Sequence, residues 1–505
     1  MPPVSAAIGM AAAYYGYPVF TMISPEQRLL TGLLFFSVVM VSFLRTLSLF
    51  PAGIGPAGKG AETPAFLSKA HILVVAAAVG FSLGAGSARS VPGPAEMGME
   101  PERITAVSGV LREDPRSLHG SSGLAVLELR SCAGAGGLRA SARGTLPVFF
   151  PAESIPRLKE FGRGCEIYTD GIYAAGIDAA GRGPSFRARS VHIVKSAPAL
   201  EQFRTGLRMT LLGKFQSRRG QAPVWGGLAS ALLLGIRDDL DTELTEAFKS
   251  SGCAHVLALS GMHLAIISGV LAFFIRRPLG IRWASLIGAI FIVFYIFVAG
   301  SQPSLVRSGI MYLIAAFALW GLLKGKPLSL LSMAFIIQLI FQCETGVSLS
   351  FILSYLALAG ILSLGETLRS LCRGRIPPIL AGSLCSSLGA FIVTSPVVAY
   401  YFGSLKPVGI IAGLFIMPLC SLFMVLSLAA LAAAFIPLPL WDLLDILLGW
   451  LYRFMELLAA QAGRVPGINV SDPVPVLVIT VLLWLFVLFI QRRDMMYRNR
   501  IESFD

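Results

Sequence analysis

Two histidines and an arginine stand at the edges of apolar segments in the middle of the chain. His255 and His263 bracket the sequence His255-Val-Leu-Ala-Leu-Ser-Gly-Met-His263, and Arg307 follows a short polar turn. On an unbroken helix, at about 100° per residue, the histidines would lie about 80° apart and could border one cavity. Ser260 and Gly261 between them permit a close backbone approach or a local break. Two interpretations stay open: a polar lining for the path of a charged substrate, or histidines hydrogen-bonded to neighbouring helices.

Other polar groups interrupt the later apolar segments. Ser350, Ser354 and Tyr355 give one segment a hydroxyl face, which helix-to-helix hydrogen bonding explains equally well. Residues 441–460 carry a charged stripe whose members fall within about 80° at helical spacing. The stripe consists of Asp442, Asp445, Arg453 and Glu456. Lipid does not tolerate such a stripe, so the helix lines a wet cavity or lies flat at the interface.

The pattern of histidines and cysteines indicates no metal site. The five histidines form no HExxH or HxHxDH motif, and the seven cysteines include no CxxC and no zinc-type Cys/His spacing. The sequence also has no ATP-binding loop and no redox-cofactor motif. We therefore expect no catalytic residues, no cofactor and no enzyme activity.

The composition predicts a polytopic α-helical membrane protein. The chain has 505 residues, of which 55% are hydrophobic and 14% charged, against roughly 25% charged in a soluble domain. A spanning helix needs about 20 apolar residues. We predict about 12 spans and read the first as retained rather than as a cleaved signal peptide. The predicted spans are 4–23, 29–50, 71–88, 256–275, 283–299, 305–322, 328–341, 347–364, 376–402, 408–435, 441–460 and 474–490.

Five domains follow from the changes in composition. Residues 1–90 form N-terminal membrane helices, residues 91–203 a small all-β domain, residues 204–254 an amphipathic, interfacial linker, residues 255–491 a second membrane domain, and residues 492–505 a basic tail. The β domain is predicted from five short alternating runs, at 104–111, 124–129, 145–150, 166–172 and 187–194. The linker opens with a basic run that contains Arg204, Arg208, Lys214, Arg218 and Arg219.

The loops between spans fix an expected orientation, because cytoplasmic loops favour Lys and Arg. Basic residues gather at 59–69, 276–282, 324–326, 369–375 and in the tail. An N-terminus inside places all of these loops inside, together with the C-terminus, and places the β domain outside. There, Cys132 and Cys165 are a candidate disulfide, with two unpaired thiols as the alternative.

Five passages, in order, resemble the ComEC family of competence proteins, which bring transforming DNA through the bacterial cytoplasmic membrane. The passages are Ala231-Leu-Leu-Leu-Gly-Ile-Arg-Asp-Asp-Leu240, Ser251-Gly-Cys-Ala-His-Val-Leu-Ala-Leu-Ser-Gly-Met-His-Leu264, Val298-Ala-Gly-Ser-Gln-Pro-Ser-Leu-Val-Arg307, Gly346-Val-Ser-Leu-Ser-Phe351 and Thr394-Ser-Pro-Val-Val-Ala-Tyr-Tyr-Phe-Gly403. The family often has Gln at the position of Ser348 and Asn near Gly413. Many members continue into a C-terminal metallo-β-lactamase-like domain, so this chain resembles a short form without it.

The resemblance implies that the inserted β domain is OB-like and that the chain is a membrane channel component for single-stranded DNA. The basic run at 204–219 would extend the electrostatic path of the DNA toward the membrane. The candidates for lining the polar entry and the pore are His255, Ser260, Gly261, His263, Arg307, Ser350 and Ser354. Candidate base-stacking residues in the β domain are Phe149, Phe150, Phe161, Tyr168 and Tyr173. Expected partners are single-stranded DNA, membrane lipid, a competence DNA receptor, a cytoplasmic helicase or translocase and a separate nuclease. The alternatives are a transporter of another anionic substrate and a membrane assembly factor.

Overall fold

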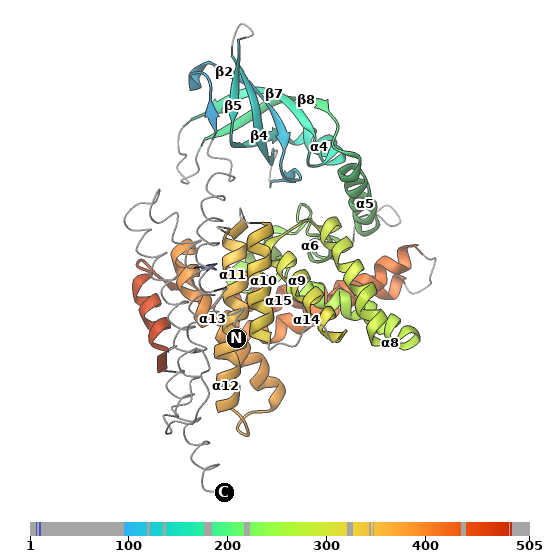
Figure 1. The fold of residues 1–505 in the computed structure, drawn as a ribbon, viewed down its shortest axis with the longest axis vertical. Helices are drawn as coiled ribbons and strands as arrows, with labels where there is room; N and C mark the ends of the chain where they lie inside the picture. The colour runs from blue at the N-terminus through green and yellow to red at the C-terminus, as the bar shows by residue number, and fades with distance from the viewer. Residues whose placement is uncertain are drawn as a thin grey trace, which may run out of the picture.

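The computed structural model contains a β domain and a helical domain. The helix α5 connects the two (Figure 1). The described residues are 7, 10, 11, 95–118, 122–134, 138–175, 184–216, 223–320, 327–342, 345–346, 348–435, 441–483 and 485–486. The predicted spans 29–50 and 71–88 and the basic tail lie outside the described residues, as does nearly all of the span 4–23.

The β domain is built on five long strands that close into a barrel. These are β2 (Ile104–Leu111), β4 (Ser122–Gly134), β6 (Thr145–Pro151), β7 (Glu166–Ala174) and β8 (Ser185–Lys195). Around the barrel the order is β4, β2, β7, β8, β6 and back to β4; the β6–β8 pair is parallel and the others are antiparallel. The short helix α4 (Ile155–Phe161) connects β6 to β7. All five predicted strands are confirmed.

Alternating apolar residues explain why these strands close around a core. In β6 and in β4 as far as Leu129, buried residues alternate with more exposed ones, as expected for strands with one face inside. Val107, Leu127, Leu146, Val148 and Ile167 are all completely inaccessible to solvent. Three shorter strands attach to β4 and its neighbours: β1 (Glu96–Met97), β3 (Arg116–Ser117) and β5 (Arg139–Arg143).

The predicted bridge between Cys132 and Cys165 is wrong, because both thiols are free and buried. Cys132 lies on β4 opposite Val107 of β2. Cys165 lies on the other side of β2, where its carbonyl accepts from the Leu111 amide. Two strand spacings amount to about 9.5 Å, which exceeds the roughly 7 Å limit between the Cα atoms of a disulfide.

Three helices lead from the β domain into the helical domain: α5 (Ala199–Gln216), α6 (Gly226–Leu234) and α7 (Thr242–Ser250). The helix α7 is short and amphipathic, and it lies within the linker at 204–254 that was predicted to be amphipathic. Its N-cap Asp241 accepts from the Glu243 amide, and Leu244 and Phe248 form its buried face. Gly252 follows it with φ of 78°, a conformation that favours glycine.

The helical domain contains long apolar helices of a membrane protein. Among the described residues, four segments are long and apolar enough to cross a membrane: Gly261–Ala299, Leu349–Leu371, Pro378–Phe402 and Val408–Ala434. The helices are α8 (Gly261–Ala299), α9 (Pro303–Leu319), α10 (Pro327–Phe341), α11 (Leu349–Gly360), the π-helix η5 (Ile361–Gly365), α12 (Glu366–Leu371), α13 (Pro378–Phe402), α14 (Val408–Phe435) and α15 (Trp441–Gly463). Shorter apolar helices are Pro303–Leu319, Pro327–Phe341 and Val474–Leu483.

The helix α8 doubles back on itself. Gly280, after Pro278, has φ of 78° and interrupts the helical backbone. The Ser304 hydroxyl, just beyond the end of α8, donates to the Leu259 carbonyl just before its start, at 2.6 Å. A straight helix of 39 residues would be about 58 Å long and would keep those groups apart. The predicted pair of spans at 256–275 and 283–299 thus corresponds to two antiparallel halves of α8.

Candidate functional site

The two signature histidines do not share a helix. His255 lies in the 3-10 turn η3 (Ala254–Val256), and its side chain is exposed. Ser260 then adopts an extended backbone, with φ −132° and ψ 174°, and α8 begins at Gly261. His263 lies in the first turn of α8 and is completely buried. The break at Ser260-Gly261 therefore separates an exposed histidine from a buried one.

Hydrogen bonds fix the protonation of the His263 ring. The Ser260 backbone N–H donates to Nδ1 at 3.1 Å, and the Ser260 hydroxyl lies 2.9 Å from the same atom. A backbone N–H can only donate, so Nδ1 carries no proton and the neutral ring carries its proton on Nε2. That Nε2–H is buried and has no hydrogen-bond partner among the described residues.

Arg307 lies close by, in the second turn of α9. It is 7% exposed, and its Nη2 makes one long contact of 3.5 Å with the Ser308 hydroxyl. The guanidinium also lies over the Tyr355 ring, 5.8 Å from the centroid, within the range of a cation–π contact. Its Nε and Nη1 are buried and, in the part of the chain that the structure describes, have no acceptor.

A set of buried hydrogen bonds holds the helices around Arg307. Gln338 of α10 donates from Nε2 to the Pro303 carbonyl at the start of α9, at 3.0 Å. Tyr355 of α11 donates from its hydroxyl to Gln338 Oε1 at 2.8 Å. The Ser304 bond to Leu259 ties α9 to the start of α8. Four helices thus converge on one arginine.

Gly261 allows this close convergence. A Cβ atom at this position would lie 2.5 Å from the Ser308 hydroxyl oxygen and 3.4 Å from Arg307 Nη2. The first distance is too short for any carbon atom, so a side chain here would push α8 away from α9. Glycine therefore keeps the first turn of α8 against the arginine.

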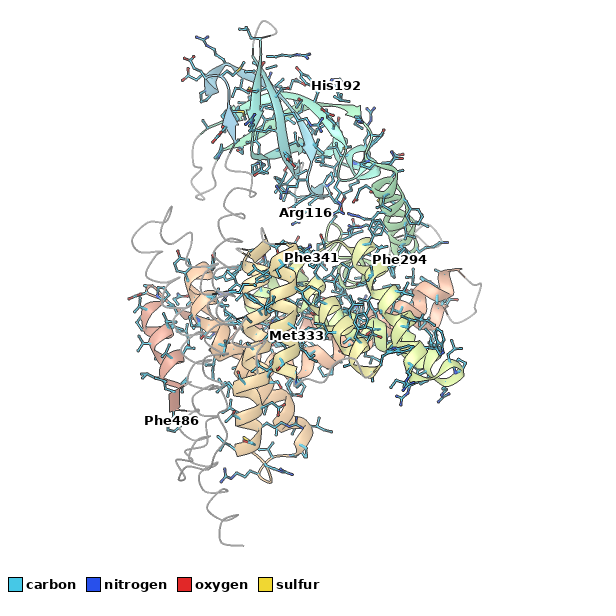
Figure 2. All side chains as sticks on the ribbon, viewed as in Figure 1. Arg116, His192, Phe294, Met333, Phe341 and Phe486 are labelled. Carbon is cyan, nitrogen blue, oxygen red and sulfur yellow. The ribbon has the colours of Figure 1, made fainter. Side chains whose placement is uncertain are left out.

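The loop between α6 and α7 joins this cluster to the β domain. Asp238 accepts from the Ser117 amide of β3 at 2.9 Å and forms an ion pair of 2.9 Å with Lys159 of α4. Arg237, beside it, is exposed and lies within electrostatic range of His263 and of Arg116. Figure 2 shows Arg116 on the side of the β domain that faces the helices.

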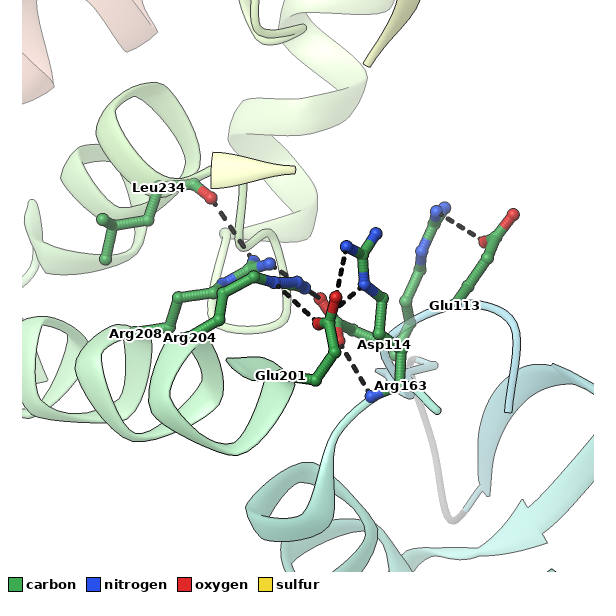
Figure 3. A network of polar contacts seen from close by, with 8 residues as sticks. Glu113, Asp114, Arg163, Glu201, Arg204, Arg208 and Leu234 are labelled. Atoms are coloured by element: carbon green, nitrogen blue, oxygen red, sulfur yellow. Dashed lines mark hydrogen bonds and ion pairs between the residues drawn. The ribbon is translucent and has the colours of Figure 1, made fainter. Parts of the chain in front are cut away.

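A second charged cluster fastens α5 to the β domain (Figure 3). Arg204 is 1% exposed and pairs with Asp114 and with Glu201, the latter at 3.3 Å. Arg208 Nη1 lies 2.7 Å from Asp114 Oδ2, and Arg163 contacts both Glu201 oxygens at 2.8 and 2.7 Å. Burial alone would raise the pKa of Asp114, but Arg208 and Arg204 outweigh it and hold that pKa below its usual value.

The basic residues of α5 that were predicted to extend an electrostatic path have a different role in the structure. Arg204 and Arg208 were expected to present charge to a substrate, but both are engaged with Asp114. Arg218 and Arg219 lie outside the described residues. At Arg204 and Arg208 the charge of this run therefore serves to attach the β domain.

Several other candidates lie away from the Arg307 cluster. On α11, Ser350 is exposed and Ser354 half-buried, while Tyr355 alone reaches the arginine. The stripe of Asp442, Asp445, Arg453 and Glu456 lies on α15, which packs against α14 and α7. Asp445 accepts from Trp225 Nε1 at 2.7 Å.

The candidate stacking residues of the barrel divide into core and surface. Phe150 is 1% exposed and belongs to the core, and Phe161 and Tyr173 pack against that core. Phe149, Phe161, Tyr168 and Tyr173 are all half-buried. Phe149 and Tyr168 do not belong to the side chains that pack against the core, which makes them the first candidates for contact with a base. No group of three or more metal-binding side chains occurs in the described ranges.

The sequence analysis did not identify two residues of this site, Gln338 and Asp238. Gln338 is a buried amide in the middle of an otherwise apolar helix, and polar groups in such helices are themselves a signal. Asp238 lies in the passage 231–240. The sequence did not predict its partners Ser117 and Lys159, because both are in the β domain and distant in the sequence.

Comparison with known proteins identifies relatives for the second half of the chain. Residues 232–495 match the sequence model of a family described as "Competence protein". The ComE operon protein 3 of Bacillus subtilis (strain 168) is 26% identical over 287 residues, which cover 53% of this chain and 35% of that protein. The uncharacterized protein YcaI of Escherichia coli (strain K12) is 32% identical over 126 residues, 23% of this chain and 16% of that one. No solved structure gives a significant match.

Proposed function

Because the chain belongs to the competence protein family, we propose that it is a membrane channel component that passes single-stranded DNA across the bacterial cytoplasmic membrane during natural transformation. The matched regions cover at most about a third of the relatives' own lengths. The family is described as competence proteins, and the proposal extends a role in DNA uptake to this chain.

The observation that carries the proposal is the buried Arg307–His263 cluster beneath the β domain. Its free donors face no carboxylate in the described part of the chain. The loop that carries Arg237 and Asp238 connects this cluster to β3 and α4. A DNA strand leaving the β domain would meet positive charge first at Arg116 and Arg237 and then at the buried arginine.

The topology of the barrel supports an OB-like domain. In chain order its strands pair first with second, second with third, first with fourth, fourth with fifth, and third with fifth in parallel. A helix, α4, lies between the third and fourth strands. OB-like barrels bind single strands by stacking bases on aromatic rings beside a basic groove. Phe149 and Tyr168 are the candidates for that role.

The expected surroundings complete the proposal. The β domain lies outside the cytoplasmic membrane and the termini inside. A competence DNA receptor delivers the strand, a cytoplasmic helicase or translocase draws it in, and a separate nuclease degrades its complement. This chain contributes no catalytic residue.

The test is transformation of a competent strain whose own gene is replaced by variants. We expect Arg307→Gln and His263→Ala to lower transformation by roughly 100-fold or more, because each removes charged or buried donors worth about 1.5–3 kcal/mol apiece. Arg276→Gln is the matched control, since Arg276 is an exposed arginine near the opposite end of the first half of α8. Membrane levels of all variants are measured by immunoblot.

Two outcomes would favour the alternative functions. Normal transformation by both variants, with defective uptake of a small anion, would indicate a transporter. Loss of transformation only from changes in the β domain, with Arg307 and His263 dispensable, would indicate an assembly factor. Either result contradicts the proposed path.

A further inference from the structure

Two helices begin at the same place in the membrane domain. α8 starts after Ser260 and α9 starts after Gln302, and the Ser304–Leu259 hydrogen bond holds the two starts together. The first turn of a helix presents free N–H groups and a partial positive charge. Two such ends in contact create a region that favours an anion.

Three buried N–H donors in this region have no acceptor among the residues that the structure describes. They are Nε and Nη1 of Arg307 and Nε2 of His263. His263 is completely buried and Arg307 is 7% exposed. A buried donor without an acceptor costs about 1–3 kcal/mol, and more where it carries charge. The region therefore contains unpaired donors, and what is missing among the described residues is an acceptor for them.

The missing acceptor must also be negatively charged. Buried charges in proteins are paired or bind an ion, yet the polar and aromatic contacts of Arg307 within the described part of the chain are the Ser308 hydroxyl and the Tyr355 ring. Arg237 adds a further positive charge within range of His263. A neutral acceptor, such as a water molecule, would satisfy one donor and leave the charge uncompensated.

We propose that Arg307, His263 and the first turns of α8 and α9 form a binding seat for one tetrahedral oxyanion. Its ligand is a phosphodiester group of the passing strand, an assignment that rests on the proposed function. The seat holds one phosphate at a time at a fixed point of the path. Arginine suits this role because its planar guanidinium presents several N–H donors to phosphate oxygens.

The first experiment measures oxyanion binding alone. The full-length protein in detergent is titrated with inorganic phosphate at constant ionic strength, with chloride as the reference salt, and thermal unfolding is followed by intrinsic fluorescence. A ligand that binds only the folded state raises the unfolding temperature. We expect the apparent Kd for phosphate to rise roughly tenfold or more in Arg307→Gln and His263→Gln. Arg276→Gln should behave like the unmodified protein.

The comparison between variants removes the general effect of phosphate on protein hydration, which all share. An identical phosphate response in the unmodified protein and both seat variants overturns the seat. Should Arg307→Gln fail to fold, His263→Gln and Arg307→Lys give the same comparison, with Arg307→Lys keeping part of the response because it keeps the charge.

The second experiment identifies the source of the phosphate group. A short single-stranded oligonucleotide and anionic lipid vesicles each compete with phosphate. Competition by the oligonucleotide supports the assignment, and competition by the lipid alone overturns it. If the seat exists but Arg307→Gln transforms normally, the proposed function fails and the seat stands. If transformation is lost while no variant changes phosphate binding, the seat fails and the proposed function stands.

Discussion

Two arginines of this protein are almost equally buried, and their surroundings are opposite. Arg204, at 1% exposure, lies between Asp114 and Glu201 where α5 meets the β domain. Arg307, at 7% exposure, lies where α8 and α9 begin and has no carboxylate beside it among the described residues. Carboxylates of the chain itself therefore offset the desolvation cost of burying the guanidinium at Arg204. No described carboxylate does so at Arg307.

This difference separates attachment from binding. A charge that the fold pairs internally contributes to the position of a domain, and removing its partner exposes the full cost of burial. A buried charge that the fold leaves unpaired destabilises the ligand-free protein. Such a charge is expected at a site where a bound ligand supplies the opposite charge. The Asp114 cluster thus belongs to the first class and the Arg307 cluster to the second.

The largest effect on stability is expected at the paired site. Asp114→Ala leaves Arg204 and Arg208 without their shared carboxylate and should cost about 3 kcal/mol. This is the low end of the range for breaking a buried pair, because Glu201 still contacts Arg204. Hydrogen–deuterium exchange of the full-length protein should show faster exchange across α5 and β3. Glu113→Ala is the control, because its pair with Arg116 is exposed on both sides.

An unchanged exchange rate in Asp114→Ala would show that the Arg163–Glu201 pair and the Asp238 contacts hold the β domain without Asp114. In that case Arg204 would no longer be an example of a buried charge that attaches a domain.

The next effect is smaller and has the opposite sign. Arg307→Met replaces an unpaired buried cation by an apolar side chain of similar length, so the protein without ligand should gain up to about 2 kcal/mol in stability. Thermal unfolding in chloride buffer measures this change, with Arg276→Met as the control at an exposed position. A marked loss of stability in Arg307→Met would mean that Arg307 has a structural role after all.

Sequence reasoning went furthest where the pattern is local. The alternation in 104–111 and the four later runs gave all five barrel strands, because a half-buried strand repeats every two residues. His263 and Arg307 stood out because ionisable groups are rare in apolar helices. Gly261 was recognised as a point of close approach, and the structure shows what approaches it.

It failed where two distant segments meet. Nothing in the sequence pairs Asp114 with Arg204, which lie 90 residues apart, so the basic run of α5 looked like a substrate path. The disulfide prediction treated two cysteines of one domain as neighbours, although β2 lies between them. Tyr355 reaches Arg307, and Gln338 bonds to Tyr355 and to Pro303, only because α10 and α11 pack against α9, an arrangement that periodicity does not specify.

The smallest effect concerns pH and sharpens the paired half of the comparison. The pKa of Asp114 lies below its usual value, since Arg208 and Arg204 outweigh the effect of burial. A depressed folded pKa contributes stability above the unfolded value of about 3.9, and that stability is lost as the pH falls through the still lower folded pKa. Between pH 7 and pH 5 the exchange protection of α5 should therefore change little. Protection should fall below about pH 4, and Asp114→Asn, which cannot titrate, should already show the low-pH behaviour at pH 7. Loss of protection between pH 6 and pH 5 in the unmodified protein would place the titrating group elsewhere and remove Asp114 as the source of the attachment.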